Sequence, residues 1–168
     1  MTTPRIVQIN ISKGGVPKRP ISQALVTRSR IHGDDWNDTK HHGIPGQALC
    51  LFSLEVIEDL VRLGYPLFPG ALGENLTTEH LDYRSVRPGQ TYRLGNDVRI
   101  RITKVRQPCR TIAVYGASLL RELYDVEVKR GNVDTARWGR SGFYAEVLRE
   151  GTILPGDPII AEASNFSL

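Results

Sequence analysis

Apolar and polar residues alternate over several short segments of the chain, and this period of two is typical of β-strands that bury one face. The clearest case is residues 98–105, where Val98, Ile100 and Ile102 share one face and polar residues occupy the other. Residues 47–52 instead form an almost continuous apolar run, which indicates a fully buried strand. The same criteria predict further strands at residues 5–12, 24–31, 91–94, 143–148 and 158–161.

Two segments have a helical pattern. Ser53 is a suitable N-cap for a helix that ends at Gly64, with an apolar stripe at positions 56, 57, 60 and 61. A second short helix is expected within residues 117–124, and Pro-Gly pairs at 69–70, 88–89 and 155–156 mark turns. The pattern predicts one mainly β domain over residues 1–168, a closed or partly closed β-barrel with short peripheral helices.

Composition agrees with a single globular domain. The chain has 168 residues, of which 40% are hydrophobic and 24% charged, so it can bury a core of its own. No apolar run approaches the roughly 20 residues that a membrane span needs, and no secretory signal is visible, so we expect a cytoplasmic protein. The net charge of +4 favours anionic partners without identifying one.

Cys109 is the first candidate for chemistry. It follows Pro108, which cannot donate a ladder hydrogen bond and is therefore expected to end the strand at 98–105 and leave Cys109 in a loop. Nearby cations stabilise a thiolate, which is the nucleophilic and metal-binding form of cysteine. These residues alone leave two interpretations open, a reactive thiol or an inert buried one. The cations concerned are Arg99, Arg101, Lys104, Arg106 and Arg110.

Other polar segments are weaker candidates. Cys50 lies in an apolar run and is expected to be a core residue. One polar segment contains three histidines and three aspartates, among them His32, His41, His42 and Asp34. Such a segment can supply acid–base groups or ligands for a hard metal, but the spacing of these residues favours a solvated surface loop. Residues 70–77 form a loop bracketed by glycines that is not a P-loop, and residues 131–142 are either a basic flap or a plain loop.

Taken in order, these segments resemble the MOSC family, named for the C-terminal domain of molybdenum-cofactor sulfurase. The resemblance extends from about residue 8 to residue 161 and is closest to small stand-alone bacterial members. Gly-Glu-Asn-Leu at 73–76, followed by Gln-Pro-Cys at 107–109, is its most specific part. The other matching segments are 12–18, 33–34, 42–43, 69–72, 142–144, 147–148 and 156–157.

The resemblance implies a β-rich barrel with Cys109 at its pocket, where it carries sulfur as a persulfide or binds the molybdenum of molybdopterin. Cys109, His42 and Asp34 become the candidate catalytic residues, the last two as proton-handling or supporting groups. The implied cofactor-binding residues are Lys13, Gly73, Glu74, Asn75, Arg106, Arg110 and Arg140. The family usually has His-Gly-Gly followed by an acid where this chain has His42-Gly43-Ile44, which puts the role of His42 in doubt.

Three functions follow. The leading one is a molybdenum-cofactor-binding or sulfur-carrier domain; any pyridoxal phosphate would belong to a partner desulfurase, because the chain is too short to contain that domain. The alternative is a molybdenum-dependent reductase of N-hydroxylated compounds that relies on a separate electron donor. A small basic barrel that binds nucleic acid is disfavoured, because no aromatic residue interleaves with the basic residues at 99–110 to provide a stacking surface. The sequence does not indicate an oligomeric state.

Overall fold

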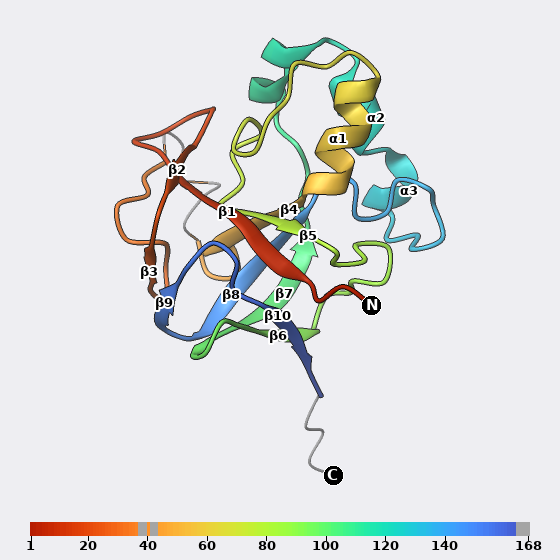
Figure 1. The fold of residues 1–168 in the computed structure, drawn as a ribbon. Helices are drawn as coiled ribbons and strands as arrows, with labels where there is room; N and C mark the ends of the chain where they lie inside the picture. Colours follow the sequence, from red (N-terminus) through yellow and green to blue (C-terminus); the bar gives the residue numbers. More distant parts are fainter. Residues whose placement is uncertain (37–39, 41–43, 164–168) are drawn as a thin grey trace.

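The computed structural model describes residues 1–36, 40 and 44–163, and most of its regular structure is β. One sheet contains eight strands in the order β10-β6-β7-β8-β4-β5-β1-β2, and β3 pairs with β9 in a second sheet (Figure 1). The strands are β1 (Arg5–Ile11), β2 (Arg19–Ile21), β3 (Ala24–Val26), β4 (Leu49–Ser53), β5 (Leu76–Glu79), β6 (Thr91–Leu94), β7 (Val98–Val105), β8 (Phe143–Arg149), β9 (Gly151–Ile153) and β10 (Ile159–Glu162).

Short helices make up the rest of the regular structure. They are α1 (Leu54–Arg62), the 3₁₀-helix η1 (Arg110–Tyr115), α2 (Leu119–Leu123) and α3 (Val126–Lys129). The α-helices gather on one side of the molecule (Figure 1). The expectation of a mainly β fold with short helices is therefore confirmed.

Strand pairing does not confirm a closed barrel. Among the described residues the large sheet runs from β10 at one edge to β2 at the other, and these two strands do not pair. The two edges nevertheless approach each other through β1, because the Ile6 amide donates to the Asp157 carbonyl at 2.9 Å and the Ile159 amide to the Pro4 carbonyl at 2.8 Å. These bonds join the two ends of the chain.

Two apolar clusters stabilise the fold. The larger one fills the space enclosed by the sheets, and its fully buried members include Ile9, Leu76 and Ile100. The smaller one packs α1, η1 and α2 together around Phe52, Leu60, Leu72, Ile112 and Leu119. Because Ile112 and Leu72 belong to the same cluster, the segment after Cys109 is packed beside the glycine loop at 70–73.

Most predicted elements are present at nearly their predicted bounds. The strand at 98–105 is β7, and the Ser53 side chain caps α1 by accepting a hydrogen bond from the Val56 amide. The predicted strand at 24–31 is shorter, because Thr27 and Arg30 form a turn after Val26. The predicted strand at 158–161 is β10, one residue later at each end.

Candidate functional site

Cys109 lies in the position that the sequence predicts, just beyond the end of β7. It precedes the first residue of η1 and is exposed, whereas Cys50 in β4 is buried, and neither forms a disulfide. The Cys109 thiol is in hydrogen-bonding contact with the Thr111 hydroxyl, two residues further along the chain. Of the two thiols, that of Cys109 is therefore the accessible one.

Arg106 connects this segment to the rest of the site. Its side chain is only 6% exposed, and its guanidinium donates to the Leu72 carbonyl in the glycine loop. Its backbone is held as well, since its amide donates to the Gly142 carbonyl at 2.9 Å and its carbonyl accepts from the Ser141 hydroxyl at 2.6 Å. A buried arginine fixed at both ends gives a stationary positive charge in the low-dielectric interior.

The Arg106 guanidinium has electrostatic partners that were not predicted from the sequence. It interacts electrostatically with the thiols of Cys50 and Cys109 and with the Tyr144 hydroxyl. Cys50 and Tyr144 are direct partners in the β4–β8 pairing. Burial raises the pKa of Tyr144 to about 12, although Arg106 opposes the shift. Burial also raises the pKa of the Cys50 thiol, again against Arg106.

The glycine loop places a carboxyl group beneath the site. Glu74 is fully buried, and its Oε1 accepts from the Gly70 amide at 2.6 Å and from the Thr77 hydroxyl at 2.9 Å. Its Oε2 has no hydrogen-bond partner among the described residues. Burial raises the pKa of Glu74, and the Arg106 guanidinium acts in the opposite direction. Gly73 has a φ of 81°, which few other residues adopt, and an added Cβ would lie 3.1 Å from Val16.

Asp34 belongs to a buried polar network beside this loop. It is 2% exposed; its Oδ1 binds the Lys18 ammonium group and accepts from the Ser12 amide at 2.9 Å. Its Oδ2 accepts from the Asn75 side-chain amide at 2.9 Å, and the Asn75 side-chain oxygen Oδ1 accepts from the Cys50 backbone amide at 3.0 Å. The network thus joins the segments at 12–18, 33–34 and 73–76 that carry the resemblance. Lys18 is a member that the sequence did not single out.

The remaining predicted site residues are scattered. Lys13 is exposed in the loop after β1, and Arg110 is exposed at the first residue of η1, next to Cys109. Arg140 instead contacts the helices, where it donates to the Glu122 carbonyl at 3.1 Å and pairs with Asp59 at 3.5 Å. His42 lies outside the described residues. Within the described part of the chain, no group of three His, Cys, Asp or Glu side chains could hold a metal, and no helix is long and apolar enough to cross a membrane.

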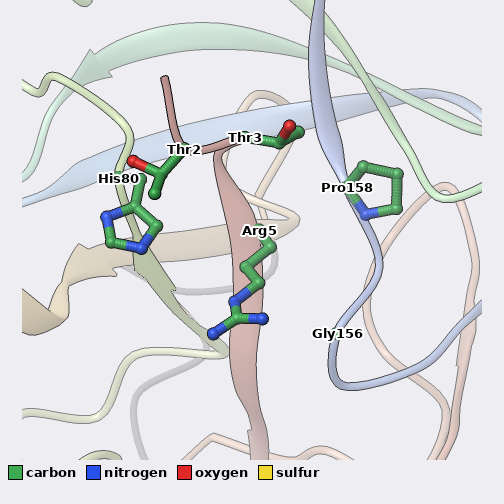
Figure 2. A pocket seen from close by; sticks show the side chains of 6 residues that line it. All are labelled: Thr2, Thr3, Arg5, His80, Gly156 and Pro158. Carbon is green, nitrogen blue, oxygen red and sulfur yellow. The ribbon is translucent and has the colours of Figure 1, made fainter.

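Two cavities lie away from the Cys109 cluster. The smaller, of about 240 Å³, is lined by Thr2, Thr3, Arg5, His80, Gly156 and Pro158 (Figure 2). The larger, of about 400 Å³, is lined by His80 and Arg140 among others. Neither is lined by Cys109, Arg106 or Glu74.

Comparison with known proteins identifies the family. The family model of the MOSC domain matches residues 38–160, most of the chain. The chain belongs to the MOSC domain family. A MOSC relative, the uncharacterized protein YflK of Bacillus subtilis (strain 168), is 33% identical over 145 residues, which cover 84% of this chain and 60% of YflK.

Two further comparisons extend this MOSC assignment. A protein named "Reductase" from Gibberella moniliformis (strain M3125 / FGSC 7600) is 36% identical over 90 residues, which cover 54% of this chain and 14% of that protein. The crystal structure of YiiM from Geobacillus stearothermophilus superposes with a TM-score of 0.71 and 27% identity, covering 98% of this chain and 77% of that one. The matched regions span 60% of the length of YflK and 14% of that of the Gibberella protein, less than two thirds of each of these two curated relatives.

Proposed function

We propose that this MOSC domain binds the molybdenum cofactor or carries sulfur, and that Cys109 is its reacting residue. The observation that carries the proposal is the exposed Cys109 thiol, placed directly after β7 and within electrostatic range of the buried Arg106 guanidinium. Arg106 thus places a fixed positive charge near an accessible sulfur, the atom by which cysteine acts as nucleophile and metal ligand. Membership of the MOSC family supports the assignment of the cofactor.

The residues present fit an anionic, soft-ligand cofactor. Cys109 supplies an accessible sulfur donor, and Lys13 and Arg110 are exposed cations that form no ion pair in the described part of the chain. Guanidinium and ammonium groups of this kind bind phosphate strongly. The Oε2 atom of Glu74 is a hydrogen-bond acceptor below the glycine loop. It is buried and has no partner among the described residues. Arg140 is engaged with Asp59 and is not part of this set.

A bound molybdenum cofactor supplies redox chemistry at its metal. The protein's own residues would have simpler roles there: Cys109 would donate a sulfur lone pair, Arg106 would place a fixed positive charge near that sulfur, and Arg110 and Lys13 would hold the phosphate. Asp34 holds the segments at 12–18 and 73–76 together, because it accepts hydrogen bonds from the Ser12 amide and from the Asn75 side chain. The proton-handling role of Asp34 stays a prediction.

In the sulfur-carrier role, the Cys109 thiolate attacks the terminal sulfur of a persulfide on a partner desulfurase that contains pyridoxal phosphate. A new S–S bond forms at Cys109, the partner's S–S bond breaks, and its electron pair leaves on the partner's thiolate. The step needs an exposed sulfur, and Cys109 meets this condition whereas Cys50 does not.

A second candidate is a molybdenum-dependent reductase of N-hydroxylated compounds supplied by a separate electron-donor protein. It is favoured by the similarity of 54% of the chain to the relative named "Reductase". Turnover of an N-hydroxylated base with a chemical reductant, by the cofactor-loaded protein, would separate a reductase from a pure carrier.

The first test measures bound molybdenum and pterin after expression in a host that makes the cofactor. We expect both at close to one equivalent in the wild type and their loss in Cys109→Ala. Cys50→Ala is the matched control, because it removes the buried thiol and should retain the cofactor.

Two outcomes would contradict the proposal in turn. Absence of molybdenum from the wild type would remove the ligand role. The carrier role would then require a mass increase of one sulfur atom at Cys109 after incubation with a cysteine desulfurase and cysteine. Without that adduct, the proposed function fails altogether.

A further inference from the structure

The surface beside Cys109 is built from three segments that contain cations and no acids. They are residues 12–19, 63–73 and 104–120, with six lysines and arginines and no aspartate or glutamate. The Lys18 amide donates to the Gly70 carbonyl at 2.9 Å, which joins the first segment to the second. The Arg106 guanidinium donates to the Leu72 carbonyl, which joins the third segment to the second. We call the surface formed by these three segments the basic face.

Carboxylates from elsewhere in the described chain do not neutralise the basic face. Its hydrogen bonds to carboxylates reach Asp34 and Glu74, and both are buried, so six cations meet two acidic groups. Asp35, whose amide donates to the Ser12 carbonyl at 2.8 Å, is paired with Arg30 at 3.1 Å. The exposed charge of the basic face is therefore positive. Its exposed cations that form no ion pair with a described residue are Lys13, Arg19 and Arg110.

The basic face also exposes large apolar side chains. Val114 of η1 is 76% exposed, and Phe68 in the second segment is 40% exposed. The rings of Phe68 and Tyr115 pack edge to face with their centroids 6.3 Å apart, so the two segments form one apolar patch. Arg19 lies within electrostatic range of the Tyr115 hydroxyl, which places a cation beside this patch. Apolar side chains bordered by charged ones are typical of protein–protein interfaces.

The apolar patch extends well beyond the thiol. Cys109 precedes η1, and Tyr115 is the last of its six residues. Because a 3₁₀-helix rises about 2 Å per residue, Tyr115 lies about 12 Å along η1 from Cys109. Neither of the two cavities is lined by Phe68, Val114 or Tyr115. A small sulfur donor on the thiol does not cover this patch, whereas a protein surface does.

Charge and polarity select the kind of macromolecule. A second copy of the chain would bring the same cations against this face, because a two-fold interface pairs a patch with itself. The phosphates of a nucleic acid would meet the cations, but a valine as exposed as Val114 matches an apolar protein surface better than a polyanion. An acidic protein with an apolar patch complements both features of the face.

We infer that the basic face docks an acidic protein that carries the persulfide. Val114 and Phe68 contact an apolar patch of this donor, and the exposed cations contact its carboxylates. Docking brings the donor's persulfide to Cys109, whose thiolate forms an S–S bond with the terminal sulfur while the donor's S–S bond breaks and its electron pair leaves on the donor's thiolate. The inference rests on the sulfur-carrier role proposed above and adds the surface that recognises the donor and the charge of that donor.

Sulfur transfer from two donors tests this docking. A bacterial cysteine desulfurase charged with cysteine is the protein donor, and glutathione persulfide is the small donor. Mass spectrometry follows the gain of one sulfur atom at Cys109. With the desulfurase, the rate for the wild type should fall at least about tenfold between about 50 and 500 mM NaCl, because salt screens the attraction between exposed charges.

Val114→Asp and Arg19→Glu decide whether the basic face is responsible. Each should slow transfer from the desulfurase about tenfold. Each should leave loading by glutathione persulfide within about threefold, because the Cys109 sulfur stays exposed. Val126→Asp and Arg84→Glu are the matched controls. They change a valine of α3 that is 56% exposed and an exposed arginine after β5, both outside the basic face, and should keep the wild-type rate within about twofold.

The outcomes separate this inference from the carrier role. Equal desulfurase rates in Val114→Asp, Arg19→Glu and the wild type would overturn the docking and leave the carrier role intact. Loading of the wild type by glutathione persulfide but not by the desulfurase would do the same. Binding to vesicles of phosphatidylcholine and phosphatidylglycerol that is lost in Val114→Asp would also overturn it, because the face would then bind lipid. If glutathione persulfide does not load wild-type Cys109, the carrier role fails and the docking inference fails with it.

Discussion

At the residue scale, the loops around Cys109 are positioned by buried charges. Asp34 and Lys18 form an ion pair in which the two side chains are 2% and 8% exposed, and Asp34 also accepts from Ser12 and Asn75. A buried pair contributes little net stability over an apolar pair, but removal of one partner leaves an uncompensated charge. Asp34 thus has a structural role in this network, independent of the proton-handling role predicted for it.

We therefore predict that Asp34→Asn lowers the free energy of unfolding by about 3–5 kcal/mol, measured by urea denaturation. Asp35→Asn is the matched control, because Asp35 pairs with Arg30 at 3.1 Å on the surface, and its loss should change stability by less than about 1 kcal/mol. An Asp34→Asn protein as stable as the wild type, yet unable to hold molybdenum, would instead favour the proton-handling role.

The sequence predicted part of this site. Cys109 was found from its neighbours, since a proline before it and cations around it are local signals. The contacts of Arg106 with Cys50 and Tyr144 were not found, because they depend on which residue of β4 pairs with which residue of β8. Arg140 was assigned to the cofactor; its guanidinium contacts Asp59 of α1 and the Glu122 carbonyl of α2, and the assignment stays a prediction.

At the element scale, the close approach of β4 to the segment before β8 constrains one glycine. Gly142 has a φ of 84°, and an added Cβ would lie 2.2 Å from the Leu51 carbonyl oxygen. That distance is far inside a normal contact, and the Gly142 carbonyl also receives the Arg106 amide. Gly142 thus sets the spacing between β4 and the site segment.

Gly142→Ala should lower the free energy of unfolding by more than about 3 kcal/mol, because the backbone of β4 must move. Gly131→Ala is the control: its φ of 81° is similar, but nothing lies within 4 Å of the added Cβ. That variant should lose only about 1–2 kcal/mol, the strain of the left-handed conformation. Equal losses in thermal or urea unfolding would mean that the contact with Leu51 is relieved without cost.

Elements with a clear period were predicted, and those without one were missed. β7 alternates over eight residues, and its bounds agree with the prediction. β5 was missed because Thr77 and Thr78 are both buried and polar, so no alternation is visible. They are buried because β5 lies between β1 and β4. β2 and β9 have three residues each, too few to show a period.

At the scale of the whole molecule, the sequence predicts the class of fold but not which segments hydrogen-bond to each other near the edges of the sheet. The contacts between Ile6 and Asp157 and between Pro4 and Ile159 join residues about 150 positions apart, and no local pattern encodes them. The same limit applies to the environment of Glu74, whose burial comes from the assembly of the loop, β1 and β5. That environment makes the stability of the whole chain depend on pH.

Burial raises the pKa of Glu74 above its ordinary value of 4.5, so the folded chain holds this proton more tightly than the unfolded chain. Stability from this group is therefore fully present below pH 4.5 and is lost as pH rises toward the folded-state pKa. Other carboxylates contribute to the pH profile as well. The informative quantity is therefore the unfolding free energy of the wild type minus that of Glu74→Gln, which keeps the shape and the acceptor for Gly70 without the charge.

We predict that this difference falls as pH rises above 4.5, with a slope of at most about 1.4 kcal/mol per pH unit, the limit for one proton. Urea denaturation at a series of pH values measures it. Glu58→Gln, which removes an exposed carboxylate of α1, controls for the change in net charge. A difference that stays level or rises above pH 4.5 would contradict the prediction, because it would show that burial does not raise the pKa of Glu74 in the folded chain.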